Sequence, residues 1–510
     1  MSDTNLYSRL ARHFPADDTA VALEAAEGHY TYGDIERGSA CLANMLASLG
    51  LPLGARVLVQ VEKSPEALLL YLATLRAGLV FVPLNTAYQP AEMAYFIDDA
   101  RPDVLVCSSG NLPTLTRIVQ DSGWGAHILT LDDNQQGSLL EQAAAMPQSF
   151  HTVPVAGEAL AVIIYTSGTT GRSKGAMLSH DNLYANADAL KSVWQWRQQD
   201  VLLHMLPLFH VHGLFVGANG ALLAGARMRW LPRFDVGQAL DALPGTTIMM
   251  GVPTYYTRLL ADSRLDAGIT RSVRVFISGS APLLADTFEQ FRQRTGHAIL
   301  ERYGMSETNM LSSNPYAPEA GPRLPGTVGR ALPGVQIRIV DPDAKPVSPG
   351  AIGDIQVKGA NVCAGYWQMP EKTGEAFTGD GWFKTGDLGH FGSSDGRTPP
   401  DYLTIVGRSK DLIISGGYNV YPKEVEHELD TLPGVLESAV FGVPHPDFGE
   451  AVRAAIVVRS GQSFDAVAAL AVLRQRLANY KLPKQIDILD ALPRNTMGKV
   501  QKNVLRDRAV

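Results

Sequence analysis

The sequence predicts an α/β protein in two parts: a large N-terminal domain of layered, mostly parallel sheets with helices, and a small C-terminal α+β domain. Three observations support this prediction. The chain has 510 residues, more than one hydrophobic core usually organises. Helix and strand signals alternate along its first four hundred residues. A glycine- and charge-containing segment, 407–411, then precedes a second and shorter set of signals.

The alternation begins with a helix followed by a strand. Ser64, Pro65 and Glu66 supply a cap, a first-turn proline and an acidic first turn, and the apolar run after them ends at Gly78. Residues 79–84, Leu-Val-Phe-Val-Pro-Leu, then predict a strand. This order is typical of a parallel sheet whose crossover connections are helices.

The same alternation recurs downstream. Strands are predicted at 161–165, 273–278 and 298–302, with a helix at 285–295 between the last two. The polar stretch 131–158 predicts a surface loop before the first of these strands. We therefore expect parallel sheets flanked by helices in the large domain.

A second unit is predicted after the segment at 408–411. Residues 424–429 predict a helix and residues 454–458 a strand. We expect a large domain over 1–407, a hinge at 408–411 and a small domain over 412–510.

Bulk composition narrows the function classes. A net charge of -7 offers no basic field to gather nucleic acid. No apolar run approaches the roughly 20 residues that cross a bilayer, and the first residues lack the pattern of a secretory signal. Three separated cysteines indicate neither a disulfide framework nor a metal site. We expect a cytoplasmic protein with no nucleic-acid or membrane partner.

The strongest chemical signal is the run Tyr-Thr-Ser-Gly-Thr-Thr-Gly-Arg-Ser-Lys-Gly at 165–175. Its glycines let backbone N–H groups approach an anion, its hydroxyls add donors, and Lys174 adds positive charge. Such clusters are often mobile surface turns, but the length of this one and its attachment to a strand favour a phosphate cradle. Its spacing differs from that of P-loop NTPases.

Further motifs follow in order at large separations: 301–307, Glu-Arg-Tyr-Gly-Met-Ser-Glu; 381–387, Gly-Trp-Phe-Lys-Thr-Gly-Asp; 407–408, Gly-Arg; and 493–499, Pro-Arg-Asn-Thr-Met-Gly-Lys. Together the motifs make the chain resemble the adenylate-forming superfamily of acyl-CoA synthetases, luciferases and peptide-synthetase adenylation domains, over about residues 30–502. The resemblance implies that a carboxylate attacks the α-phosphate of ATP and that a thiol or another acceptor then takes the acyl group. It also implies Mg²⁺ as cofactor, ATP and CoA as co-substrates, and a mobile C-terminal domain.

Site residues also follow from the resemblance. Lys174, Glu307, Lys499 and the pocket residue His210 would be catalytic. Lys499 would stabilise charge between the carboxylate and the α-phosphate, although a terminal lysine is usually just solvated. Glu307 and Thr166 would bind Mg²⁺. The expected ATP- or AMP-binding residues are Thr166, Ser167, Gly168, Thr169, Thr170, Lys174, Ser280, Ala281, Pro282, Glu301, Tyr303, Gly304, Ser306, Asp387, Arg408 and Lys499. Lys410 is expected in the hinge, and the residues expected in the CoA tunnel are Gly416, Gly417 and Tyr418.

The resemblance places Arg302 at the acyl pocket, where we expect it to select the acyl substrate. An unpaired guanidinium in an apolar pocket is unfavourable, so it demands an anion, and a second substrate carboxylate offers bidentate pairing. With the segment Pro-Leu-Phe-His-Val-His-Gly-Leu at 207–214, the segment around Arg302 resembles that of malonyl-CoA synthetases. The resemblance implies malonate as substrate and methylmalonate as a slower one. The residues expected to bind the acyl group are Arg302, His210, Val211, Met310 and Ser278.

Several alternatives remain at this point. Arg302 could pair with Glu301 and leave an apolar pocket for short or medium-chain monocarboxylates. The acyl group could pass to a carrier-protein thiol, or the fold could serve as a silent nucleotide-binding regulator, against which the intact charged site residues argue. His210 and His212 could hold a metal, although no third ligand is placed nearby.

One regulatory hypothesis also follows from the resemblance. A lysine acetyltransferase that modifies Lys499 would remove its charge and stop adenylation without stopping thioester formation.

Overall fold

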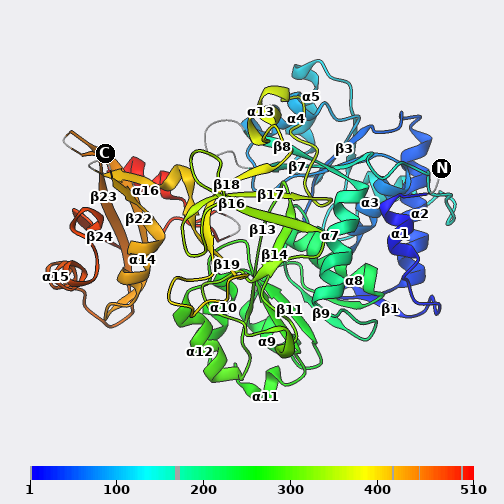
Figure 1. Ribbon diagram of the computed structural model, residues 1–510. Coiled ribbons are helices and arrows are strands. Elements are labelled where there is room, and N and C mark those ends of the chain that lie inside the picture. Colours follow the sequence, from blue (N-terminus) through cyan, green and yellow to red (C-terminus); the bar gives the residue numbers. More distant parts are fainter. Residues whose placement is uncertain (1–2, 167–172, 416–417, 447, 496–497, 510) are drawn as a thin grey trace.

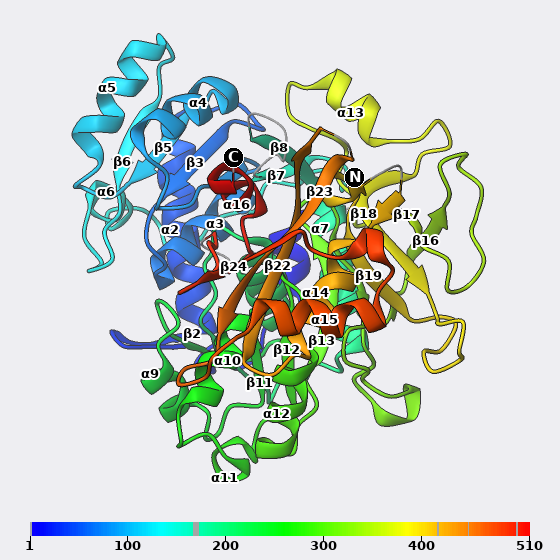
Figure 2. The same cartoon turned by 90° about the vertical axis from the view of Figure 1, so that its left-hand side faces the viewer.

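The computed structural model describes residues 3–166, 173–415, 418–446, 448–495 and 498–509. Three sheets with their helices make up a large N-terminal domain, and a fourth sheet forms a smaller C-terminal domain, coloured orange to red, at its side (Figure 1). The C-terminal domain faces the viewer in Figure 2 and lies across the sheets of the large domain. The predicted α/β class with two domains is therefore confirmed.

A six-stranded sheet carries both ends of the run predicted to be a phosphate cradle, in the strand order β6-β5-β3-β4-β7-β8. Its strands are β3 (Arg56–Gln60), β4 (Val80–Pro83), β5 (Val104–Cys107), β6 (His127–Thr130), β7 (Leu160–Thr166) and β8 (Lys174–Ser179). All neighbours are parallel except β7 and β8, which are antiparallel and place Thr166 opposite Lys174. The first and last residues of the run at 165–175, Tyr165 and Gly175, are therefore paired in this sheet. Its helices are α2 (Tyr32–Ser48), α3 (Pro65–Arg76), α4 (Pro90–Ala100), α5 (Leu112–Ser122) and α6 (Ser138–Ala143).

A nine-stranded sheet forms the other large layer, in the order β15-β14-β13-β12-β11-β9-β10-β1-β2. Its strands are β1 (Val21–Ala25), β2 (Gly28–Thr31), β9 (Val201–His204), β10 (Arg227–Trp230), β11 (Ile248–Gly251), β12 (Val275–Ser278), β13 (Leu300–Met305), β14 (Asn309–Ser313) and β15 (Arg330–Ala331). The run from β1 through β10, β9, β11 and β12 to β13 is parallel. Because carboxyl ends of parallel strands meet at one edge, the residues that follow these strands gather there.

The helices of this half of the large domain include one π-helical segment, η1 (His212–Ala218), which leads directly into α8 (Asn219–Ala224). The remaining ones are α1 (Leu6–Ala11), α7 (His180–Val193), α9 (Val236–Ala242), α10 (Pro253–Ala261), α11 (Ala267–Thr270), α12 (Ala285–Thr295) and the 3-10 turn η2 (Pro318–Ala320).

An antiparallel sheet, β16-β17-β18-β19, connects the large domain to the small one. Its strands are β16 (Val335–Val340), β17 (Gly353–Gly359), β18 (Phe383–Phe391) and β19 (Leu403–Arg408), with α13 (Pro370–Ala376) between β17 and β18. The C-terminal sheet contains β20 (Ile413–Ser415), β21 (Tyr418–Val420), β22 (Val435–His445), β23 (Gly449–Val458) and β24 (Gln485–Leu489). Its helices and turns are η3 (Ser409–Asp411), α14 (Pro422–Asp430), α15 (Ala466–Arg476), η4 (Asn479–Lys481) and α16 (Lys502–Ala509).

Most elements predicted from the sequence form as expected. The Ser64 side chain caps α3 by accepting from the Ala67 N–H at 3.1 Å, and α12 has the predicted bounds. Two features differ from the prediction. The polar stretch 131–158 contains the short helix α6, and the antiparallel sheet β16–β19 was not anticipated. Within the described ranges, no helix combines the length and the apolar character that crossing a bilayer requires.

Candidate active site

Asp387 is the centre of a buried polar group at the edge of the antiparallel sheet. It lies on β18 opposite Arg408 of β19, whose Nε is 2.8 Å from Asp387 Oδ1. The Tyr303 hydroxyl donates to the other carboxylate oxygen at 2.5 Å. Burial, and then the charge of Asp387, raise the pKa of Tyr303 well above its usual value, so the phenol stays protonated. Held in this way, Asp387 is a rigid acceptor for hydroxyl groups.

Lys174 and Glu307 form a second polar group around the Tyr366 ring. Lys174 Nζ lies 4.4 Å from the ring centroid, and the Tyr366 hydroxyl donates to Glu307 Oε1 at 3.1 Å. Burial raises the pKa of Glu307, while the contact with Tyr366 and the charges of Arg408 and Lys174 oppose the rise. The Thr166 hydroxyl, at the end of β7, donates to the Lys174 carbonyl at 3.5 Å. A cation, a carboxylate and a hydroxyl thus border the phosphate cradle.

Arg302 is buried on β13 without an acidic partner in the described part of the chain. Only 4% of its surface is exposed, and its Nε and Nη2 atoms are buried with no hydrogen-bond partner there. The guanidinium lies against the backbone of Gly279, where a Cβ would be 2.4 Å from Arg302 Cζ. Glu301, the candidate internal partner, accepts instead from the Gly326 N–H at 3.2 Å. Burial lowers the pKa of Arg302 to about 9, so it is charged at neutral pH.

Further unsatisfied polar atoms lie beside Arg302. His212 Nε2 and Ser278 Oγ, at the end of β12, are buried without a hydrogen-bond partner in the described residues. The other ring nitrogen of His212, Nδ1, is 3.4 Å from Ser280 Oγ, and its backbone N–H donates to His210 Nδ1 at 3.2 Å. Burial first, and then the positive charge of Arg302, lower the pKa of His210 to about 4 and that of His212 well below its usual value. Both imidazoles are therefore neutral at pH 7.

Backbone geometry brings these groups together. His212 begins the π-helical segment η1, and a Cβ on the next residue, Gly213, would lie 2.1 Å from the Pro207 carbonyl oxygen. Ser280 has φ of 70°, a left-handed conformation that is unfavourable for a residue with a side chain. π-Helical turns and strained backbone both concentrate at functional sites.

Lys499 reaches the same region from the C-terminal domain. Its N–H donates to Asn495 Oδ1 at 2.9 Å, and its carbonyl accepts from the Asn495 N–H at 2.9 Å, which closes a tight loop. The Lys499 surface is open to solvent. Even so, the surrounding protein atoms, and then repulsion by Arg408, lower its pKa to about 8, while Asp387 opposes the shift. Lys499 therefore adds its charge to the Asp387 group.

The remaining predicted residues have different positions. Val211 and Met310 are each 2% exposed, and Met310 lies opposite Gly304 in the β13–β14 ladder. Ser306 lies between the end of β13 and Glu307, while Ala281 and Pro282 follow Ser280. Tyr418 is 60% exposed, stacks on Tyr480 and is not brought to the site, and Lys410 is exposed in η3. Ser167, Gly168, Thr169, Thr170, Gly416 and Gly417 lie outside the described residues.

Sequence reasoning missed two residues of this region, Gly279 and Tyr366. It named His212 but did not place it beside Arg302. A glycine directly after a strand and a histidine in the compact segment His-Val-His-Gly were available signals, whereas nothing in the sequence connected Tyr366 with Glu307. In the described residues no three potential metal ligands gather, so the His210–His212 pair has no third ligand there.

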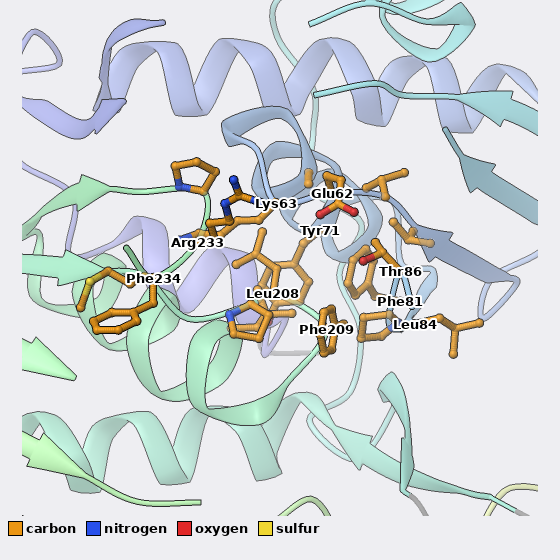
Figure 3. Close-up of a pocket in the computed structure, with 18 of the residues that line it drawn as sticks. Glu62, Lys63, Tyr71, Phe81, Leu84, Thr86, Leu208, Phe209, Arg233 and Phe234 are labelled. Atoms are coloured by element: carbon orange, nitrogen blue, oxygen red, sulfur yellow. The ribbon is translucent and has the colours of Figure 1, made fainter. Parts of the chain in front are cut away.

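A cavity of about 230 Å³ lies beside the segment that carries His210. Tyr71 and Phe81 form part of one wall, and Leu208 and Phe209 form part of another (Figure 3). Lys63, also in the lining, donates to the carbonyls of His204 and Leu231 at 2.8 and 2.5 Å, so its ammonium is already hydrogen-bonded. The cavity is thus mainly apolar, and its lining includes Phe209, the residue before His210 in the chain.

Sequence comparison identifies the class of protein. Residues 8–367 match the model of the AMP-binding enzyme, and residues 424–499 match the model of the AMP-binding enzyme C-terminal domain. The chain belongs to the AMP-binding enzyme family.

Particular relatives narrow the similarity. A mitochondrial malonate–CoA ligase of Mus musculus is 35% identical over 95% of this chain and 88% of its own length. A sulfoacetate–CoA ligase of Cupriavidus necator is 34% identical over 96% of this chain and 95% of its own. The crystal structure of ATP-bound MatB from Rhodopseudomonas palustris is 50% identical, covers 99% of both chains and has a TM-score of 0.95. The apo form of MatB has a TM-score of 0.85.

The depressed pKa of Lys499 gives a testable pH dependence. Because Lys499 loses its proton as the pH rises through about 8, we expect kcat/KM for ATP, measured by pyrophosphate release, to fall above that pH. In Lys499→Arg, whose guanidinium does not titrate in this range, the fall should be absent even if the rate is lower. An identical alkaline limb in both proteins would exclude Lys499 as the titrating group.

Proposed function

We propose that the chain is an AMP-forming malonate–CoA ligase, which converts malonate, ATP and CoA to malonyl-CoA, AMP and pyrophosphate through an acyl-adenylate. The observation that carries this proposal is Arg302, a buried charged guanidinium with no acidic partner in the described residues. A substrate with a second carboxylate satisfies it, whereas a simple alkyl acid leaves it unpaired. The relatives named malonate–CoA ligase support the same substrate.

The second carboxylate of malonate binds among three donor residues. Arg302 offers Nε and Nη2, and Ser278 offers its hydroxyl. If His212 Nδ1 accepts from the Ser280 hydroxyl, its Nε2 carries the proton and becomes the third donor. Charge-assisted hydrogen bonds of this kind orient a carboxylate as well as bind it. The other end of malonate is then directed away from Arg302, toward the nucleotide.

In the first half-reaction, an oxygen of the malonate carboxylate that is not bound to Arg302 attacks the α-phosphorus of ATP. The bond to the bridging oxygen breaks, and pyrophosphate leaves. Lys499 stabilises the negative charge between the two reacting groups, and Lys174 at the cradle binds the outer phosphates. Asp387 accepts hydrogen bonds from the ribose hydroxyls, while Ser280, Ala281 and Pro282 border the adenine.

The residues present fit a magnesium ion that is bound together with ATP. Mg²⁺ usually combines one or two protein carboxylates with substrate phosphates rather than occupying an all-protein cage. Glu307 is a buried carboxylate beside Lys174, and Thr166 supplies a hydroxyl at the start of the cradle. Mg²⁺ held there would neutralise phosphate charge as pyrophosphate departs.

In the second half-reaction, the thiol of CoA attacks the acyl carbonyl carbon, loses its proton, and AMP leaves. The mainly apolar cavity lined by Phe209 is our candidate route for the thiol arm, because Phe209 directly precedes His210 in the chain. Between the two half-reactions the small domain turns about a hinge, which we place at 408–411, with the domains at 1–407 and 412–510. Ser409 Oγ donates to Asp354 of the large domain at 2.9 Å, while Asp411 pairs with Arg506 of the small one at 2.8 Å.

Other dianions fit the same pocket. Methylmalonate adds one methyl group, which the pocket residues Val211 and Met310 would border, and we expect it to react more slowly. Sulfoacetate carries a sulfonate in place of the second carboxylate, and a relative 34% identical is named for it. Acetylation of Lys499 by a lysine acetyltransferase stays a prediction, in which loss of the charge stops the first half-reaction.

Arg302→Met tests the substrate class. We expect kcat/KM for malonate to fall by about 100-fold or more, because the second carboxylate loses a buried charged partner. The value for acetate should stay equal or rise. The measurement is CoA-dependent AMP release with malonate, methylmalonate, sulfoacetate, acetate and octanoate.

Arg294→Met is the matched control, because the Arg294 guanidinium already donates hydrogen bonds to three backbone carbonyls. Its order of substrate preference should equal that of the wild type. A wild type that prefers acetate or octanoate would contradict the proposal, and pyrophosphate release without CoA-dependent turnover would indicate a carrier-protein acceptor.

His212→Asn tests the third donor. Because a hydrogen bond to a charged group contributes about 1.5–3 kcal/mol, we expect KM for malonate to rise by roughly 10-fold or more. Activity with acetate, which has no second carboxylate, serves as the internal control and should change little. Equal losses with both substrates would show that His212 only supports the fold of η1.

A further inference from the structure

Arg494 lies five residues before Lys499 and contacts two different parts of the C-terminal domain. Its Nη1 donates to the Gly498 carbonyl at 2.6 Å, directly before Lys499. Its Nη2 pairs with Glu437 on β22. One guanidinium therefore connects the loop that carries Lys499 to the central sheet of the small domain.

The rest of this loop is short and hydrogen-bonded. Arg494 and Val500 form an isolated β-bridge, and the Gln501 N–H donates to the Pro493 carbonyl at 2.8 Å. Directly after the loop, Lys502 Nζ is 2.6 Å from Glu426 Oε1 on α14. Hydrogen bonds before and after the loop thus hold its base. At Gly498, the side chain of Arg494 connects the loop backbone to the sheet.

Gly498 of this loop lies against the large domain. A Cβ on Gly498 would be 3.1 Å from Thr254 Oγ1 of α10, and Gly498 has φ of 74°, which favours glycine. The position of the Gly498 backbone sets where the long Lys499 side chain starts. A displacement of about 1 Å at a reacting group can lower a rate about 100-fold, so a brace at this position has a large effect on the chemistry.

We propose that Arg494 is a positioning residue for the first half-reaction: with Glu437 it braces the Gly498–Lys499 backbone so that the Lys499 ammonium meets the carboxylate and the α-phosphate. Arg494 itself touches no substrate. The proposal rests on the role of Lys499 given under the proposed function. Because Lys499 serves adenylation and not thioester formation, loss of the brace should separate the two half-reactions, which a general loss of stability would not do.

The experiment measures each half-reaction separately. Adenylation is followed by single-turnover pyrophosphate release with ATP and malonate without CoA, and thioester formation by CoA consumption with synthetic malonyl-adenylate. For Arg494→Met we expect adenylation to slow by about 10- to 100-fold, with KM for ATP changed by less than about threefold. The thioester rate should stay within about twofold of the wild type.

Three further variants make the result decisive. Lys499→Met is the reference and should lose adenylation alone. Glu437→Gln should slow adenylation less than Arg494→Met, and the double variant should be no slower than Arg494→Met, because the two residues act through each other. Arg453→Met is the matched control: it removes an ion pair of the same sheet, with Asp487 at 2.7 Å, away from the loop, and should slow neither half-reaction selectively.

Two outcomes would overturn the proposal. If Arg494→Met slows both half-reactions equally, or slows neither, while Lys499→Met loses adenylation, Arg494 is a structural residue only. If Lys499→Met retains adenylation, the role of Lys499 given under the proposed function is wrong, and the proposal for Arg494, which depends on it, is wrong as well.

Discussion

A charged guanidinium buried on β13 without an acidic partner in the described chain is the constraint on which the acyl site depends. Taking Arg302 out of water is unfavourable, and the surrounding fold does not compensate for it. Glycine at 279 leaves the space, and the turn at His212 and the end of β12 supply further unsatisfied donors. In the proposed function this site is completed only when a dianion binds, and an uncharged acyl tail is disfavoured because it leaves Arg302 unpaired.

The nucleotide half of the site depends on a different arrangement, in which two domains contribute opposite walls. Asp387 and Arg408 belong to the sheet that ends at the hinge, whereas Lys499 arrives on a loop of the small domain. An exposed ion pair between the domains, Arg459 with Asp286 at 2.7 Å, adds little stability because solvent screens it. In the proposed function the small domain leaves after the first half-reaction, and a weak contact of this kind would suit that movement.

Much of this could be predicted from the sequence, and the limits have physical causes. The helix at 285–295 and the cap at Ser64 follow from local signals, so they were predicted closely. The motif residues of the site were named because their order along the chain resembles a known superfamily. The antiparallel sheet β16–β19 was missed although its strands follow one another along the chain, because the connections between them are longer than the tight turns that mark a hairpin in a sequence. The missing acidic partner of Arg302 could not be predicted either, since ion pairing depends on tertiary neighbours.

The most direct test of the central claim is the thermal unfolding of the unliganded protein with Arg302 replaced by Met. Replacing a buried charged group by an apolar one of similar volume is often neutral or stabilising, by up to about 4 kcal/mol, where the charge is poorly compensated. The account predicts that Arg302→Met unfolds at an equal or higher temperature than the wild type, and that malonate with ATP no longer adds the stabilisation it gives the wild type. A clearly lower unfolding temperature would mean that Arg302 is already satisfied within the protein, and it would contradict the assignment of the pocket to a dianion.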